Sequence, residues 1–407
     1  MKLLILTQYF PPETGAPQNR LFELAVRLVK QGIDVTVLTA MPNYPQMEIY
    51  PEYKGKSYLC ESLQGITVHR SSIYVSKNKG IVSRLRNYFS FVLSAARKSS
   101  KLDPHYDFIL CESPPLFLGY TALYLKRRKK AKLIFNVSDL WPESAEKLGV
   151  VTNSFLLSFA YRLEKRLYKS SALVTGQTQG ICQNIQQRFP NVPCYWLPNG
   201  VDLSYYQPNL YNGNDWRKKY GYASDDFILF YGGIIGIAQG LEVILKAAKA
   251  LAHLPKIKFV LQGNGPEKPR LTALAKDMGL QNVQFVDSVA KTQMPDVLKS
   301  VDASVIPLRK LELFMGAIPS KIFESAAMQV PLLLGVDGEA KSLFIDQGQC
   351  GLFFEPENDK ALAAVILTIY NDHALCRSLG ENGRRFVQDK FNREKIAQSF
   401  CVALQDL

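Results

Sequence analysis

The sequence lacks long apolar runs and clustered metal ligands. No stretch of about 18 or more uncharged apolar residues occurs, so we expect no membrane-spanning helix. The seven cysteines are scattered without a Cys-x-x-Cys pair, and the four histidines are dispersed, which argues against disulfides and a zinc site. Residues 1–7 are too short for the apolar core of a signal peptide. These absences favour a cytoplasmic protein with reduced thiols.

Basic charge is concentrated in one half of the chain. The formal net charge is +13, and all of the excess lies in residues 1–200, since residues 201–407 hold equal numbers of basic and acidic residues. The surface of this basic half is either an ordinary solvated one, or it faces an anionic partner such as a membrane, a polyphosphate or a nucleic acid.

Three segments of the basic half, residues 81–98, 116–132 and 155–169, combine apolar residues with basic ones in the manner of amphipathic helices. Helices of this kind can lie on anionic lipid. No recognised nucleic-acid motif accompanies the charge. We therefore expect an anionic membrane surface as a partner, peripheral association with its inner face, and no nucleic acid. Core helices with solvated outer faces are the alternative.

The chain length and the alternation of elements predict two α/β domains. A chain of 407 residues exceeds one ordinary core, and short apolar strands alternate with helical segments throughout, which is typical of parallel sheets covered on both faces. Turn chemistry near residues 196–202 suggests domains at 1–197 and 198–387, with a C-terminal helix at about 388–407 that packs back on the first domain. Strands are predicted at residues 2–7, 34–39, 67–70, 108–111, 132–137 and 172–175, and then at 227–231, 258–262, 283–286, 303–306 and 331–335.

Three loops of the second half follow consecutive predicted strands. They are residues 232–240, which are rich in glycine, 262–267 and 286–288. Glycines between a strand and a helix let backbone N–H groups approach phosphate oxygens. The spacing is not Gly-x-Gly-x-x-Gly, and no acidic residue follows about 20 positions on, which disfavours a nicotinamide dehydrogenase. The loops therefore indicate a different phosphate ligand, with plain tight turns as the alternative.

A helix start at Pro319–Glu324 carries the most informative side chains. Ser320 is a suitable N-cap. Lys321 lies in the first turn, where the helix dipole disfavours a cation unless an anion also binds there. Glu324 projects from the same turns, and its carboxylate can accept hydrogen bonds from a vicinal diol such as that of ribose. A surface capping helix is the alternative interpretation.

Taken in order, these segments resemble the retaining GT-B glycosyltransferases of family 4, particularly those that build bacterial surface polysaccharides. The resemblance covers nearly the whole chain. It is carried by Leu197–Asp202, Gly233-x-x-Gly236-x-x-Gln239-Gly240, Gln262–Pro266 and Pro319–Pro331. It implies two doubly wound, Rossmann-like domains that face each other across a cleft. It also implies transfer of a sugar from a UDP-sugar with retention, without a bound metal or cofactor.

The resemblance also implies roles for individual residues. Glu324 would bind the ribose hydroxyls, and Lys321 with the backbone of Ser320 and Ile322 would meet the diphosphate. The nucleobase, uracil by expectation, would lie on the loops that contain Gln262, Asn264, Val286 and Asp287.

The first half would contribute two further groups. Gly15, within Glu13–Ala16, matches a loop that closes over the donor. Asp139 lies where the family often has a histidine near the sugar, and it is the nearest candidate for a catalytic residue.

The chain departs from the family pattern at several positions. Gly316 stands where the family has the first of two glutamates, and Glu312 is a candidate to replace it. A usual arginine and lysine of the glycine loop are Ile234 and Gln239 here. The phosphate charge would then be met by Lys321, Arg309 and helix N-termini.

The substrates and the class of function stay open at this point. UDP-glucose is our first choice of donor, and a UDP-linked N-acetyl or deoxy sugar is the second. The acceptor would be a lipid-linked saccharide or a glycan in envelope or exopolysaccharide synthesis. A GT-B nucleotide-sugar epimerase and an inactive scaffold subunit that binds a nucleotide-sugar are the alternatives.

Overall fold

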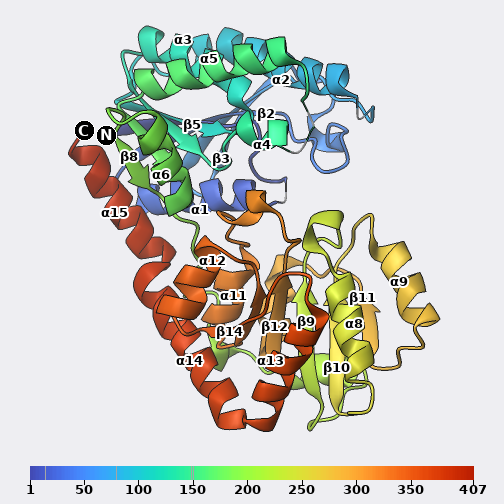
Figure 1. The fold of residues 1–407 in the computed structure, drawn as a ribbon. Coiled ribbons are helices and arrows are strands. Elements are labelled where there is room, and N and C mark those ends of the chain that lie inside the picture. The colour runs from blue at the N-terminus through green and yellow to red at the C-terminus, as the bar shows by residue number, and fades with distance from the viewer. Residues whose placement is uncertain (14, 79, 148, 150) are drawn as a thin grey trace. The chain divides into compact units, whose positions relative to one another are not determined.

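The computed structural model describes residues 1–13, 15–78, 80–147, 149 and 151–407, which form two compact units (Figure 1). Unit 1 comprises Met1–Asn199 and Arg393–Leu407, and unit 2 comprises Gly200–Asn392. Thr14, part of the predicted donor-closing loop, lies outside the described residues. The predicted fold class, two Rossmann-like α/β domains, is confirmed.

Unit 1 is built on an eight-stranded sheet in the order β3-β4-β2-β1-β5-β6-β7-β8. Its neighbours pair in parallel except for the antiparallel pair β3 and β4. Alternate residues of the central strand β1 enter two different cores, with Leu4 on one face and Leu3 on the other. The strands are β1 (Lys2–Leu6), β2 (Asp34–Ala40), β3 (Tyr58–Leu63), β4 (Ile66–Ser71), β5 (Phe108–Ser113), β6 (Lys132–Val137), β7 (Leu173–Gly176) and β8 (Cys194–Trp196).

Helices cover both faces of this sheet. One face carries α1 (Ala16–Lys30) and α15 (Arg393–Gln405), which pack through residues such as Leu28 and Phe400. The other face carries α2 (Ile81–Lys98), α3 (Gly119–Arg128), α5 (Ser154–Ser170) and α6 (Gln179–Arg188). A short helix, α4 (Glu143–Lys147), follows β6. No helix in the described part of the chain is long and apolar enough to cross a membrane.

Unit 2 contains a six-stranded parallel sheet in the order β11-β10-β9-β12-β13-β14. The chain order reverses between β9 and β12, which are neighbours in the middle of the sheet. In open α/β sheets, ligands bind outside the carboxyl ends of the strands at such a switch point. The strands are β9 (Phe227–Gly232), β10 (Ile257–Gln262), β11 (Val283–Val286), β12 (Ala303–Pro307), β13 (Leu332–Gly335) and β14 (Gly351–Phe353).

The helices of unit 2 anchor the segment that carries Lys321. On one face, α8 (Glu242–Ala250), α9 (Lys268–Asp277) and α13 (Asp359–Asn371) share a core with the strands. Elsewhere, α11 (Lys321–Ala327) packs against α14 (His373–Lys390), and the buried Phe323 lies 5.4 Å from Phe344 and 5.1 Å from Phe391 between ring centroids. This packing fixes the orientation of α11. The other helices are α7 (Asn214–Lys219), α10 (Met294–Lys299) and α12 (Glu339–Lys341).

Candidate functional site

A cavity of about 340 Å³ opens at the switch point of the unit 2 sheet. It lies at the ends of β9 and β12 and against α10 and α11. Its size falls within the range of small-molecule sites. The polar residues that line it are Gln239, Ser304, Ser320, Lys321, Glu324 and Ser325. The cavity therefore combines one cation, one carboxylate and several hydroxyl or amide groups.

Lys321 is the first residue of α11, and the surrounding protein largely shields its ammonium group from water. Its ammonium group is 3.9 Å from the centroid of the Tyr231 ring. Desolvation by the surrounding protein lowers the pKa of Lys321 to about 7, while the carboxylate of Glu324 acts in the opposite direction. Tyr231 is itself held by a hydrogen bond of 2.6 Å from its hydroxyl to the carbonyl of Ile234. An anion in this cavity would restore the charge on Lys321.

Glycine is required where the loop passes Lys321. Gly233 has φ 136°, a conformation that other residues rarely adopt. A Cβ atom at this position would lie 3.0 Å from the Lys321 ammonium nitrogen. Gly233, Ile234 and Gln239 line the cavity together with Lys321 and Glu324. The structure thus brings part of the predicted glycine loop and the predicted helix start into one site.

Two details of the helix start differ from a simple capping arrangement. Ser320 occupies the N-cap position, but its side chain makes no capping hydrogen bond, so its expected role as a cap is wrong. Its backbone is already helical, with φ −59° and ψ −28°, which is unlike the extended conformation of a capping residue. The side chain of Ile322 is fully buried in the core, so only its backbone is available at the helix start. Glu312, the candidate replacement, does not line the cavity.

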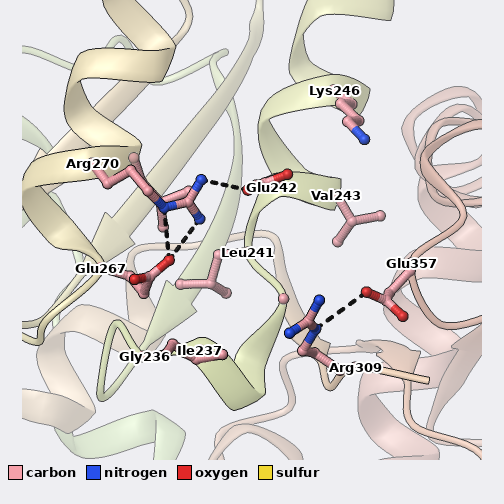
Figure 2. Close-up of a pocket in the computed structure, with 12 residues that line it drawn as sticks. Gly236, Ile237, Leu241, Glu242, Val243, Lys246, Glu267, Arg270, Arg309 and Glu357 are labelled. Atoms are coloured by element: carbon pink, nitrogen blue, oxygen red, sulfur yellow. Dashed lines mark hydrogen bonds and ion pairs between the residues drawn. The ribbon is translucent and has the colours of Figure 1, made fainter. Parts of the chain in front are cut away.

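Arg309 and Gly236 line a second, smaller pocket of about 130 Å³, together with Ile237 of the glycine loop (Figure 2). The Arg309 Nε atom lies 3.4 Å from a carboxylate oxygen of Glu357, and its backbone N–H donates to the carbonyl of Ala238. In the same pocket, Arg270 pairs with Glu242 and Glu267. Arg309 therefore lines a different pocket from Lys321, and Lys321 is the basic side chain that lines the larger cavity.

The residues predicted to hold the nucleobase form a separate cluster beside the glycine loop. The Gln262 amide donates to the carbonyl of Asp287 at 3.2 Å, and the Asn264 amide donates to the Ser288 hydroxyl at 3.0 Å. Lys268, which the sequence did not single out, pairs with the Asp287 carboxylate at 2.6 Å. These residues do not line the larger cavity.

Two close backbone contacts join this cluster to the glycine loop. The backbone N–H of Gly263 donates to the carbonyl of Val286, the last residue of β11. A Cβ atom on Gly263 would lie 1.8 Å from the carbonyl oxygen of Gly233. The loops after β9, β10 and β11 are therefore packed into one assembly at the same edge of the sheet.

Gly15 and Asp139 belong to unit 1. Gly15 immediately precedes α1, and its carbonyl accepts a hydrogen bond from the N–H of Asn19. Asp139 follows β6 and accepts a hydrogen bond of 2.8 Å from the Ser144 hydroxyl. Asp139 is exposed, yet the protein around its carboxyl group partly desolvates it and raises the pKa of Asp139. Hydrogen bonds from the Ser144 hydroxyl and the Leu140 N–H act on the pKa in the opposite direction.

A buried polar network adjoins Asp139 that the sequence did not reveal. Arg20 of α1 donates to the carboxylate of Glu112 at 2.5 Å and to the hydroxyl of Ser138 at 2.6 Å. Asn136 donates to the other oxygen of Glu112 and accepts from Thr175 at 2.6 Å. Because Ser138 directly precedes Asp139, this network fixes the turn that carries the candidate catalytic residue.

Among the described residues, no group of three or more His, Cys, Asp or Glu side chains is arranged to hold a metal ion. The polar groups of the cavity are instead a lysine, a glutamate, hydroxyls and backbone amides. Such a donor set can bind an anion and a diol.

Comparisons with known proteins match both halves of the chain. A family model described as "Glycosyl transferases group 1" matches residues 212–386. One described as "Glycosyltransferase Family 4" matches residues 18–205. A glycosyl transferase of Escherichia coli K12 named for colanic acid biosynthesis is 26% identical, with 98% of each chain covered. A glycosyltransferase of Bacillus subtilis 168 named for teichuronic acid biosynthesis is 22% identical, over 98% of this chain and 97% of that one.

Solved structures resemble the chain over its whole length. Sucrose-phosphate synthase from Thermosynechococcus elongatus has a TM-score of 0.77 at 18% identity, covering 100% of this chain and 98% of that one. Anabaena HepE in complex with UDP-glucose has a TM-score of 0.73 at 16% identity, covering 100% of both chains. At these identities, the likeness shows the fold.

Proposed function

We propose that this chain, which belongs to the GT-B glycosyltransferases of family 4, transfers a sugar from a UDP-sugar to a lipid-linked or polysaccharide acceptor in surface polysaccharide synthesis. UDP-glucose is the donor we favour, and the transfer proceeds with retention at the anomeric carbon. The enzyme works without a bound metal or cofactor. It acts at the inner face of the membrane as a peripheral protein.

One observation carries the proposal: Lys321 and Glu324 line the same cavity at the switch point of the unit 2 sheet. The diphosphate of a nucleotide-sugar is an anion, and its ribose is a vicinal diol. Lys321 would bind the first and Glu324 the second. Their separation by about one helical turn suits two adjacent parts of one ligand.

The charge on Lys321 also suits the departure of the leaving group. Negative charge grows on the nucleoside diphosphate as the bond to the sugar breaks. A fixed cation in a desolvated position stabilises that charge more than it would in water. Because desolvation holds the pKa of Lys321 at about 7, binding of the diphosphate would be coupled to protonation of this side chain.

Asp139 is our candidate in unit 1 for the group that accepts the proton of the attacking hydroxyl. A carboxyl with a raised pKa is a better base than one with its ordinary pKa. The hydrogen bond from Ser144 and the nearby Arg20 network would hold it in a defined orientation.

Binding and turnover of labelled UDP-sugars test the proposal. We expect UDP to bind the protein, UDP-glucose to be hydrolysed slowly without an acceptor, and Glu324→Gln to weaken UDP binding by calorimetry. The matched control is Glu381→Gln, which removes an exposed carboxylate of α14 in the same unit and should leave the affinity unchanged. Conversion of the UDP-sugar to an epimer would instead indicate an epimerase. Failure to bind any nucleotide-sugar would exclude both activities.

A further inference from the structure

The outer surface of α3 and α5 in unit 1 is apolar at one end and basic at the other. The two helices lie side by side over the same face of the sheet (Figure 1). The rings of Tyr120 and Phe159 are 6.2 Å apart at one end. At the other end, the Lys126 ammonium donates to the carbonyl of Ser170 at 2.5 Å. The helices therefore run in the same direction, and their exposed side chains form one surface.

Large apolar side chains are exposed in the first part of α5, and one more is exposed on α3. Phe155 is 78% exposed and Phe159 is 42% exposed, Leu156 follows Phe155 along the chain, and Tyr124 in the second half of α3 is 43% exposed. A lone exposed apolar residue on a soluble protein needs no explanation, but several that adjoin one another do. Phe155 and Phe159 are one helical turn apart on α5, so they point from the same side of that helix. Contact between this end of the surface and an apolar partner would remove these side chains from water.

The same stripe of α5 becomes basic toward its end. Arg162 and Arg166 continue the line of Phe155 and Phe159 at helical spacing, and both are exposed. Arg127 and Arg128 occupy the corresponding end of α3 and are also exposed. No ion pair joins these four arginines to an acidic side chain of the described residues. Their charge is available to an anionic partner.

Acidic residues are few on this surface, and the exposed Glu146 of α4 borders it, where its carboxylate accepts a hydrogen bond from the Tyr161 hydroxyl of α5. The helices α3 and α5 contain one acidic residue between them, Glu164, and it is fully buried. Its carboxylate accepts a hydrogen bond of 3.0 Å from Arg188 of α6, so it does not reduce the charge of the outer surface. An apolar patch beside a basic band that forms no ion pairs among the described residues matches the boundary between acyl chains and anionic headgroups.

We propose that the α3–α5 surface docks on an anionic phospholipid bilayer, with Phe155 and Phe159 inserted among the lipids and the arginines Arg127, Arg128, Arg162 and Arg166 on the headgroups. This inference rests on the peripheral association proposed above and assigns it to one surface. The surface belongs wholly to unit 1, whereas the donor cavity belongs to unit 2. Lipid binding and nucleotide binding can therefore be tested independently.

Sedimentation with vesicles of phosphatidylglycerol and phosphatidylcholine tests the assignment on the full chain. We expect Phe155→Ser/Phe159→Ser to lower the partition constant about tenfold or more, from the loss of apolar burial. Arg162→Gln/Arg166→Gln should lower it about 25-fold, since each basic residue near the surface contributes about a fivefold factor. The wild-type protein should be released by high salt and should bind pure phosphatidylcholine weakly.

Matched controls change exposed residues elsewhere in unit 1. Val402→Ser removes an apolar side chain of α15 that is 54% exposed, and Lys54→Gln/Lys56→Gln removes two exposed charges near β3. Both should bind vesicles as the wild type does. All variants should bind UDP with unchanged affinity.

Three outcomes overturn the assignment. The first is vesicle binding by both double variants that equals the wild-type value. The second is a dimer of the wild type that the phenylalanine variant abolishes without any change in vesicle binding. The third is equal retention of the wild type on a DNA fragment and on anionic vesicles, with no effect of the phenylalanine variant on either. A different combination separates the two proposals. If the wild type binds vesicles but no UDP, and the double variants lose vesicle binding, the proposed function fails and the docking surface stands.

Discussion

Binding of UDP-glucose should take up a proton at Lys321. The pKa of this side chain is lowered from 10.5 to about 7 in the unliganded protein. A bound diphosphate would return it toward its ordinary range. At pH 8, about one Lys321 in ten is charged without ligand, so binding should take up about 0.9 proton. Between pH 7 and pH 9, the dissociation constant should rise about 50-fold, because the charged fraction falls from about one half to about one hundredth.

Calorimetry in buffers of different ionisation enthalpy measures this uptake directly. Lys321→Met should bind UDP-glucose weakly, with a dissociation constant that no longer depends on pH in this range. Lys249→Met, which removes an exposed lysine at the end of α8, should behave as the wild type. A wild-type dissociation constant that stays flat from pH 7 to pH 9, without proton uptake at pH 8, would refute the assignment of Lys321 to the diphosphate.

Three further substitutions test the buried network of unit 1, the loop packing of unit 2 and the role of Asp139. Arg20→Met should lower the free energy of unfolding by about 3–5 kcal/mol in chemical denaturation, because it leaves the buried carboxylate of Glu112 without its cation. A loss below about 1 kcal/mol would contradict that role. Gly263→Ala should weaken UDP binding by at least tenfold, since its Cβ would lie 1.8 Å from the carbonyl oxygen of Gly233; unchanged affinity would show that the loops can separate. Asp139→Asn should lower kcat while leaving the affinity for UDP unchanged, and a kcat equal to that of the wild type would remove Asp139 from the mechanism.

The amino-acid sequence determined most of the central strands and the glycosyltransferase class. Apolar runs such as residues 132–137 are long enough to identify a buried strand without any tertiary information, and β6 spans the same residues. The order of the glycine loops and the Pro319–Glu324 segment was sufficient to predict a GT-B glycosyltransferase of family 4, which the comparisons confirm. These features are local, so the spacing of residues along the chain records them.

Three of the four strands at sheet edges could not be predicted in this way. The edge strands β3, β8 and β14 were missed, whereas the edge strand β11 was predicted over the residues that it spans, 283–286. Both β8 and β14 have three residues, and β3 alternates half-buried with exposed positions. A strand of three residues has too few positions for an alternating or continuous apolar pattern to be recognised, and β3 has no fully buried position that would mark it as a strand.

Tertiary structure alone decided which predicted residues share a site. Lys321 and Glu324 are joined by one helix, so their proximity could be predicted from sequence. Arg309 was expected to meet the phosphate charge together with Lys321, and in the fold it lines a different pocket, next to Glu357. The pairing of Arg20 with Glu112 joins residues 92 positions apart. Sequence periodicity specifies which face of an element is buried, whereas contacts between elements depend on strand order and loop packing, which only the folded chain establishes.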